Sequence, residues 1–257
     1  MIFGHCAQFD EVKRVKSAGY AFVELRGRAV SAMPEADFSA LRQELEALEL
    51  PCLGFNAYCP AEVVIAGPGY DRRRTRSYAS YLAGRAGQLG IRQVGIGSPA
   101  SRRLPLGFDR QLAAKQAETF LADTAECFAP MGVRVALEPL APFFCDFINT
   151  YDEAMEYIHA LTEHGVGLIL DFLNMELGGE DSRELESLAP HILHVHMSDY
   201  AETPWQRDEP KPCRIQIHQE RLRHLRAAGY DGAVSIETDL PLDEKRAAET
   251  LASVRPF

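Results

Sequence analysis

The chain has 257 residues, 46% of them hydrophobic and 25% charged, which is typical of a globular protein with a sizeable core. Its 27 basic and 37 acidic residues give a net charge of −10, which disfavours attraction to nucleic acid or to an anionic membrane. Six scattered cysteines without a CxxC pair predict reduced thiols, and no segment resembles a signal peptide or a membrane span, so we expect a cytoplasmic protein.

Short apolar runs alternate with longer helical patterns along the chain, as expected for βα units that build a parallel sheet. In the first half the expected strands are residues 1–6, 21–25, 52–55 and 93–97. The helices expected after them are residues 9–18, 34–48, 71–89 and 108–129. Gly19 marks the end of the first helix, and Pro51 precedes the third strand.

The second half repeats the pattern, with strands expected at residues 133–138, 166–171, 192–196 and 234–237. The helices expected here are residues 150–163, with Thr150 as the N-cap, then 182–188, 218–228 and 243–253. Eight such units predict a single (β/α)₈ barrel domain over residues 1–257, a length at which one such barrel is usually complete. The longest loop, residues 198–216, carries the only tryptophan, Trp205, and is expected to cover the barrel mouth.

The last four strands each end in a potential metal ligand: Glu138, Asp171, His196 and Glu237. The reactive groups of a β/α barrel lie at these strand ends, and no Lys or Arg ends any of the four strands. A single strand-end carboxylate is more often a helix cap or a loop ion pair. Buried carboxylates need a cation or a proton, so the set of four predicts one divalent ion, Mn²⁺, Mg²⁺, Co²⁺ or Zn²⁺.

Several segments together resemble the xylose isomerase-like barrel superfamily. They are Gly19-Tyr20-Ala21-Phe22-Val23-Glu24-Leu25, Leu137-Glu138-Pro139-Leu140, Asp171, His194-Val195-His196 with Asp199, and Ile236-Glu237. The resemblance covers essentially the whole chain and implies that Glu138, Asp171, His196 and Glu237 hold the metal.

The chain departs from this family at two of its histidine positions. Asn174 stands where many relatives carry a His, and Phe55-Asn56-Ala57-Tyr58 lacks the His of the endonuclease branch. An amide is a poor metal ligand, so we expect one metal ion and not three.

Five further residues are candidates for substrate binding. Asn174 can hydrogen-bond a hydroxyl, and either Arg207 or Arg214, in the long loop, can bind an anion or a hydroxyl. Glu24 ends the second strand, where a structural ion pair is an equal alternative, and Arg102 follows the fourth strand in what is alternatively a solvated loop. We expect His194 to point away from His196 as a packed structural residue.

The resemblance implies a metal-dependent isomerase or epimerase of a small sugar, keto-sugar or sugar phosphate, working through an enediolate held by the metal. Glu138 and Glu237 would then remove and return the proton. The alternatives are a dehydratase of a keto-polyol such as an inosose, an apurinic-site endonuclease-like phosphodiesterase and a non-catalytic sugar-binding barrel. We expect a small sugar-like substrate and neither nucleic acid nor membrane as a partner, and assembly into a homo-oligomer stays open.

Overall fold

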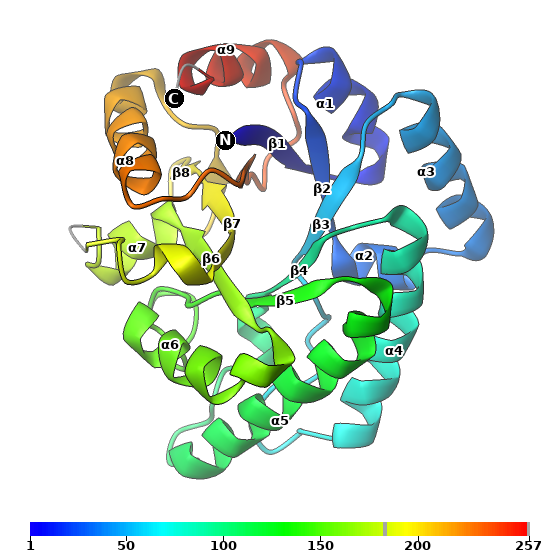
Figure 1. Ribbon diagram of the computed structural model, residues 1–257, viewed down its shortest axis with the longest axis vertical. Coiled ribbons are helices and arrows are strands. Elements are labelled where there is room, and N and C mark those ends of the chain that lie inside the picture. Colours follow the sequence, from blue (N-terminus) through cyan, green and yellow to red (C-terminus); the bar gives the residue numbers. More distant parts are fainter. Residues whose placement is uncertain (182–183, 256–257) are drawn as a thin grey trace.

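Eight short strands with largely buried side chains form a closed, fully parallel barrel that is surrounded by helices (Figure 1). The computed structural model describes residues 1–181 and 184–255. The barrel strands are β1 (Ile2–Ala7), β2 (Phe22–Arg26), β3 (Cys52–Asn56), β4 (Gln93–Ile96), β5 (Arg134–Leu137), β6 (Gly167–Asp171), β7 (Ile192–Met197) and β10 (Ala233–Ile236). Strand β1 pairs with both β2 and β10 and thereby closes the ring, which confirms the predicted (β/α)₈ fold.

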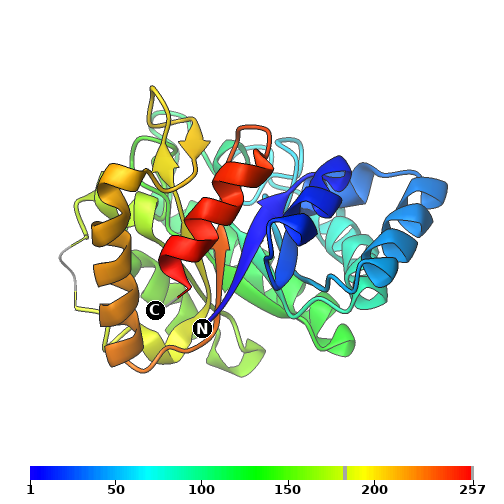
Figure 2. The ribbon, with the colours of Figure 1, turned by 90° about the horizontal axis from the view of Figure 1, so that it is seen from above.

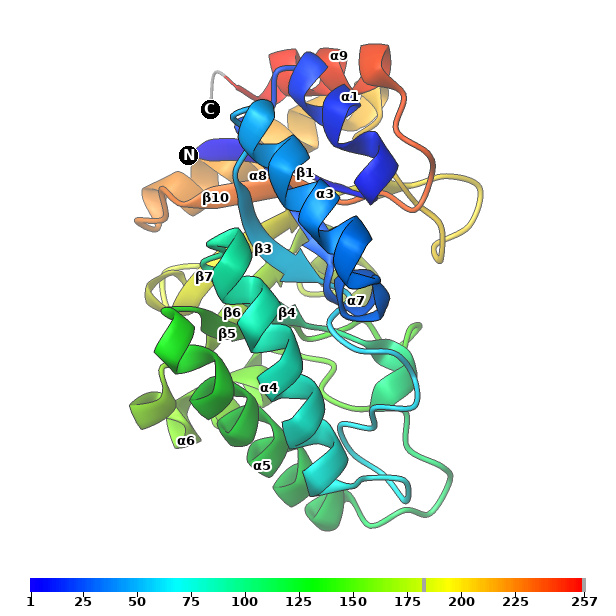
Figure 3. The same ribbon diagram turned by 90° about the vertical axis from the view of Figure 1, so that its right-hand side faces the viewer.

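Helices cover the outside of the barrel, and α4 and α5 pack side by side there (Figure 3). The helices are α1 (Val12–Ser17), α2 (Gly27–Ala32), α3 (Glu35–Ala47), α4 (Arg72–Leu89), α5 (Arg110–Phe128), α6 (Tyr151–Ala160), α7 (Phe172–Gly178), α8 (Ile215–Ala227) and α9 (Glu244–Val254). Thr150 is confirmed as the N-cap of α6, because its side chain accepts a hydrogen bond from the backbone N–H of Glu153. Among the described residues, no helix is both long and apolar enough to cross a membrane.

The segment between β6 and β7 differs from the prediction. Residues 182 and 183 of the expected helix 182–188 lie outside the described residues, and residues 184–188 form no helix. Helix α7 instead follows β6 directly, with the Asp171 side chain as its N-cap and Gly179, at φ 74°, as its C-cap. The expected short helix is therefore wrong over the residues that the structure describes.

The long loop after β7 contains a small antiparallel hairpin. Strand β8 (Asp199–Tyr200) pairs with β9 (Arg207–Asp208), and Trp205 lies in the turn between them. Figure 2 shows this hairpin, in yellow, projecting beyond the helices at one end of the barrel.

Candidate metal centre

Four neighbouring strands deliver the predicted ligand set to one point of the barrel mouth. Asp171 is the last residue of β6 and pairs in register with His196 of β7. Glu138 and Glu237 come directly after β5 and β10, and their backbone N–H groups donate to Ile96 and Met197 of the neighbouring strands. One ligand atom from each of the four side chains lies within 4.8 Å of the other three.

The His196 ring carries the observation that tests this donor set for a metal. Its Nδ1 atom is buried, has no hydrogen-bond partner, and lies 3.7 Å from Glu138 Oε1, 3.9 Å from Asp171 Oδ2 and 3.5 Å from Glu237 Oε2. A buried nitrogen left unbonded among three carboxylates is costly unless a cation completes its coordination. The four side chains therefore fit a divalent ion with mixed oxygen and nitrogen ligands.

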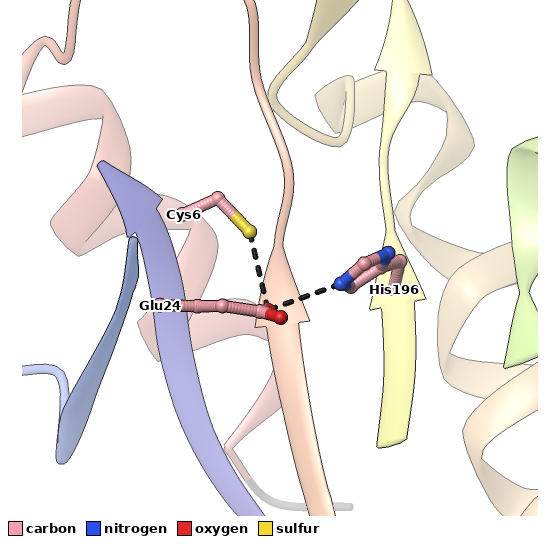
Figure 4. A group of neighbouring side chains, drawn as sticks. All are labelled: Cys6, Glu24 and His196. Atoms are coloured by element: carbon pink, nitrogen blue, oxygen red, sulfur yellow. Dashed lines mark hydrogen bonds and ion pairs between the residues drawn. The ribbon is translucent and has the colours of Figure 1, made fainter. Parts of the chain in front are cut away.

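Glu24 lies behind His196 inside the barrel and fixes its ring (Figure 4). Its Oε2 atom accepts a hydrogen bond from His196 Nε2 at 3.0 Å, which leaves Nδ1 for a metal. Burial opposes a charge on Glu24, but His194 and His196 hold the pKa of its carboxyl well below the ordinary value. Burial also opposes a charge on His196, yet Glu237 and Glu24 raise its pKa well above the ordinary value. A metal ion at Nδ1 would therefore displace a proton.

Cys6, Glu24 and His196 form a second group with the spacing of metal ligands, shown in Figure 4. Burial, followed by the charge of Glu24, raises the pKa of the Cys6 thiol well above its ordinary value. A thiol binds metal as the thiolate, and Cys6 instead donates to Glu24 Oε2 at 3.4 Å. This group supports the ring of His196 from behind.

His194 does not point away from His196, so that prediction is wrong. Side chains alternate along a strand with a period of two, so residues 194 and 196 share one face. Both rings point into the barrel, where His194 Nε2 lies 3.0 Å from Glu24 Oε2 and 2.8 Å from Ser235 Oγ. His194 thus belongs to the buried polar network beneath the ligand set.

Each glutamate of the set is held by one asparagine amide. Asn174 donates through Nδ2 to Glu138 Oε1 at 3.1 Å, and Asn56, at the end of β3, donates to Glu237 Oε1 at 3.0 Å. Asn174 was predicted to meet the substrate, and the structure places it against this glutamate. Asn56 was not predicted to belong to the site, although a polar side chain at the end of a strand was the available signal.

Arg207, from β9, places its guanidinium between two of the ligands. Its Nη1 lies 2.8 Å from Asp171 Oδ2, and its Nε lies 3.2 Å from Glu237 Oε2. Burial would lower the pKa of Arg207, but Asp171 and Glu237 raise it above the ordinary value. No Lys or Arg ends these four strands. The hairpin folds back over the strand ends and supplies the guanidinium of Arg207, which could not be predicted from the residues at the strand ends.

The other two predicted arginines are held by the protein. Arg214 pairs with Asp199, at 2.8 Å between Nε and Oδ1, and with the carboxylate of Glu176, so it does not reach the ligand set. Arg102 is fully buried behind Glu138 and donates to its backbone carbonyl at 2.7 Å. Glu24 likewise lies beneath the four candidate ligands and not at the open mouth.

A hollow of about 260 Å³ opens over the ligand set. Its lining residues are Arg28, Ala57, Cys59, Ser98, Pro99, Glu138, Leu140, Phe144, Trp205, Arg207, Glu237 and Asp239. Ala57 and Ser98 have positive φ angles of 42° and 44°, a strained conformation that is often found at functional sites. Gly97 leaves room for the carboxylate beside it, because a Cβ there would lie 2.3 Å from Glu138 Oε2.

The closed barrel and this donor set define a class of barrel proteins with a candidate metal centre at the mouth. The chain belongs to the xylose isomerase-like TIM barrel family, whose family model matches residues 12–256.

Among curated proteins, the inosose isomerase of Halalkalibacterium halodurans is 32% identical over 127 residues, which are 47% of this chain and 45% of that protein. The inosose isomerase of Bacillus subtilis is 30% identical over 137 residues, which are 51% of this chain and 48% of that protein. The matched region thus spans about half the length of these relatives.

Solved structures share the fold over nearly the whole chain. The 3-keto-D-glucoside 4-epimerase YcjR from E. coli has a TM-score of 0.79 at 19% identity, with 100% of both chains covered. A D-psicose 3-epimerase crystallised in the presence of D-fructose has a TM-score of 0.82 at 15% identity, covering 99% of this chain and 98% of that one. The IOLI protein with a binding zinc atom has a TM-score of 0.71 at 18% identity, covering 100% of this chain and 99% of that one.

Proposed function

We propose that this chain is a divalent-metal-dependent isomerase or epimerase of a small sugar, keto-sugar or sugar phosphate. The observation that carries this proposal is the buried His196 Nδ1, left without a hydrogen bond among Glu138, Asp171 and Glu237. The names of the curated relatives, inosose isomerases, support the same class of reaction.

Glu138 and Glu237 are the groups that would exchange protons with the substrate. Both line the hollow, whereas the fully buried Asp171 and His196 do not. They stand on the two outer strands of the arc β5-β6-β7-β10, so they approach a substrate from two sides. An asparagine amide holds Oε1 of each carboxylate. Oε2 of Glu138 is then left to accept or return a proton, whereas Oε2 of Glu237 would do so once the Arg207 side chain that pairs with it turns to the substrate.

A divalent ion such as Mn²⁺, held by Glu138, Asp171, His196 and Glu237, would supply Lewis acidity that makes the C–H bond beside a carbonyl more acidic. Arg207 would donate hydrogen bonds to substrate oxygens, because its side chain lines the hollow and keeps its positive charge. Glu24 would keep the His196 ring oriented during the reaction.

The test is turnover of candidate keto-sugars, keto-inositols and their phosphates in D₂O by the Mn²⁺-loaded protein. Deuterium is expected at the reacting carbon, because a carboxylate that has taken a proton exchanges it with solvent. Glu237→Gln should lower kcat by at least about 10²-fold, since an amide cannot accept the proton. The matched control is Glu244→Gln, on the exposed first turn of α9, which should leave turnover unchanged.

Complete retention of the substrate's hydrogen would contradict the acid and base roles of Glu138 and Glu237 and would indicate a hydride shift. A product lighter than its substrate by one water would identify a dehydratase instead. Metal analysis that finds three ions per chain, or none after supplementation with Mn²⁺, would contradict the proposed single-metal site.

A further inference from the structure

The outer part of the hollow presents an aromatic surface that the proposed proton transfer does not use. Trp205 lines the hollow, yet 63% of its surface is exposed, and Phe144 lies beside it. Trp205 does not belong to the buried core and packs against Phe143, with ring centroids 4.8 Å apart and planes at 8°. A large apolar side chain with so little burial does not stabilise the fold appreciably.

The stacking partner fixes the orientation of Trp205. Phe143 follows β5, and Trp205 lies at the tip of the hairpin that follows β7, so the stack joins two loops that are distant in sequence. Among the hydrogen bonds of the described residues, none joins residues 141–147 to residues 201–206 directly. Because Phe143 covers one face of the indole and does not line the hollow, the rest of Trp205 is presented to a ligand.

Polar groups surround this aromatic surface. The Arg28 side chain is exposed at the rim, and its guanidinium makes no hydrogen bond or ion pair to the described residues. Asp239 also lines the hollow, and its exposed carboxylate accepts hydrogen bonds from the backbone N–H of Arg207 and from Arg26 Nη2. A flat apolar face beside an exposed guanidinium and an exposed carboxylate matches a sugar ring, which carries C–H bonds on its faces and hydroxyls on its edge.

We propose that Trp205 and Phe144 form an outer subsite that binds a second sugar ring, so the substrate is a two-ring sugar whose reacting carbonyl lies outside the glycosidic bond, and not a free monosaccharide. This inference rests on the proposed function, because the reacting sugar must occupy the inner end of the hollow beside Glu138 and Glu237. The second ring would stack on the indole, and its hydroxyls would meet Arg28 and Asp239.

The single tryptophan makes the subsite directly observable, since all tryptophan fluorescence of the chain comes from Trp205. The Mn²⁺-loaded full chain is titrated with D-glucose and with cellobiose, and binding is followed by fluorescence and calorimetry. Cellobiose should change the emission and bind about tenfold more tightly than glucose, the ratio that corresponds to one aromatic stacking contact.

Variants test whether the preference for cellobiose over glucose comes from the indole of Trp205. Trp205→Ala should abolish the preference for cellobiose, and Trp205→Phe should keep part of it, both measured by calorimetry. Tyr81→Ala removes a comparably exposed aromatic ring from α4 and should leave the preference unchanged. Equal affinity for the two sugars in the unaltered protein, or a preference that persists in Trp205→Ala, would overturn the proposal.

D-glucose 6-phosphate distinguishes an anion site from a ring site. Tighter binding of the phosphate than of cellobiose, lost on Arg28→Ala and not on Trp205→Ala, would also overturn the second-ring assignment. The failures are separable, because binding does not require turnover. A preference that depends on Trp205 without any deuterium exchange would refute the isomerase alone, and exchange on monosaccharides without a Trp205 effect would refute the subsite alone.

Discussion

Glu24 is a buried carboxylate that orients His196, one of the four proposed metal ligands, from behind. It accepts hydrogen bonds from His196 Nε2 and Gln93 Nε2, and it lies within ion-pair distance of His194. A hydrogen bond to one ring nitrogen fixes which nitrogen is free to bind metal. The orientation of His196 Nδ1 toward Glu138, Asp171 and Glu237 therefore depends on Glu24.

We predict that Glu24→Gln weakens metal binding by about 10- to 100-fold, the range typical for loss of a hydrogen-bonding partner behind a metal ligand. The amide keeps the shape of the side chain but loses the negative charge, which strengthens the hydrogen bond from His196 Nε2 and so favours metal binding at Nδ1. Competition with a metal chelator measures the affinity. Cys145→Ala is the control, because this buried thiol donates to the carbonyl of Phe147 and not to Glu24, and the variant should bind metal normally. Equal metal affinity in Glu24→Gln and the unaltered protein would refute the role.

At the residue scale, the four candidate metal ligands could be predicted because each of them ends a strand. Glu138, Asp171, His196 and Glu237 each close an apolar run, and the carboxyl ends of parallel strands meet at one rim. The contacts across the barrel were not predictable, because the pairing of Asn56 with Glu237, or of Arg207 with Asp171, depends on how the barrel closes.

At the element scale, long periodic helices such as α4 and α5 were predicted to within a few residues, whereas short elements were missed. Strands β8 and β9 have two residues each, too few for an alternation pattern. Helix α7 was missed because its N-cap, Asp171, was interpreted as a ligand alone, whereas its Oδ1 caps the helix and its Oδ2 faces the ligand set.

Asp199, in β8, fastens the hairpin to the segment before α8 and to α8 itself. This carboxylate receives hydrogen bonds from the backbone N–H of Lys211 at 2.7 Å and from Arg214 Nε at 2.8 Å, and it lies 3.2 Å from His218 Nε2. Burial opposes its charge, but the bonds from His218 and Lys211 lower the pKa of Asp199 to about 2, from an ordinary value of 3.8.

A depressed pKa means that the ionised Asp199 stabilises the fold above the pKa of the unfolded chain. This contribution is present above about pH 4 and is lost as pH falls toward about 2. We predict that Asp199→Asn lowers the free energy of unfolding by about 2 kcal/mol at neutral pH, and that the difference shrinks below about pH 4. Urea unfolding over this pH range measures it, with the exposed Asp37→Asn on α3 as the charge-matched control. A difference independent of pH would show that the contribution is not ionic.

At the scale of the whole molecule, the barrel was predictable because eight apolar runs recur along the chain and each must pair with its neighbours. Closure of the barrel brings four negative carboxylates close to His196, those of Glu24, Glu138, Asp171 and Glu237. The net charge of the whole chain is also negative, at −10. Without a metal, His196 and Arg207 are the cations that balance these carboxylates. The repulsion that remains should make the stability of the whole barrel depend on metal.

We predict that Mn²⁺ stabilises the protein to the extent given by mass action, about 2.7 kcal/mol at a free concentration one hundred times the dissociation constant. For a protein of this size that corresponds to a rise in Tm of about 5 to 10 °C, which calorimetry measures with and without a chelator. Asp171→Asn is the informative variant, because the remaining Oδ1 can still accept the N–H of Asn174 and cap α7, whereas the anionic ligand is lost. Its Tm should respond to Mn²⁺ by much less than that of the unaltered protein, and it should bind less than one equivalent. An undiminished rise in Tm in Asp171→Asn would remove Asp171 from the ligand set and place the stabilising ion elsewhere on the barrel.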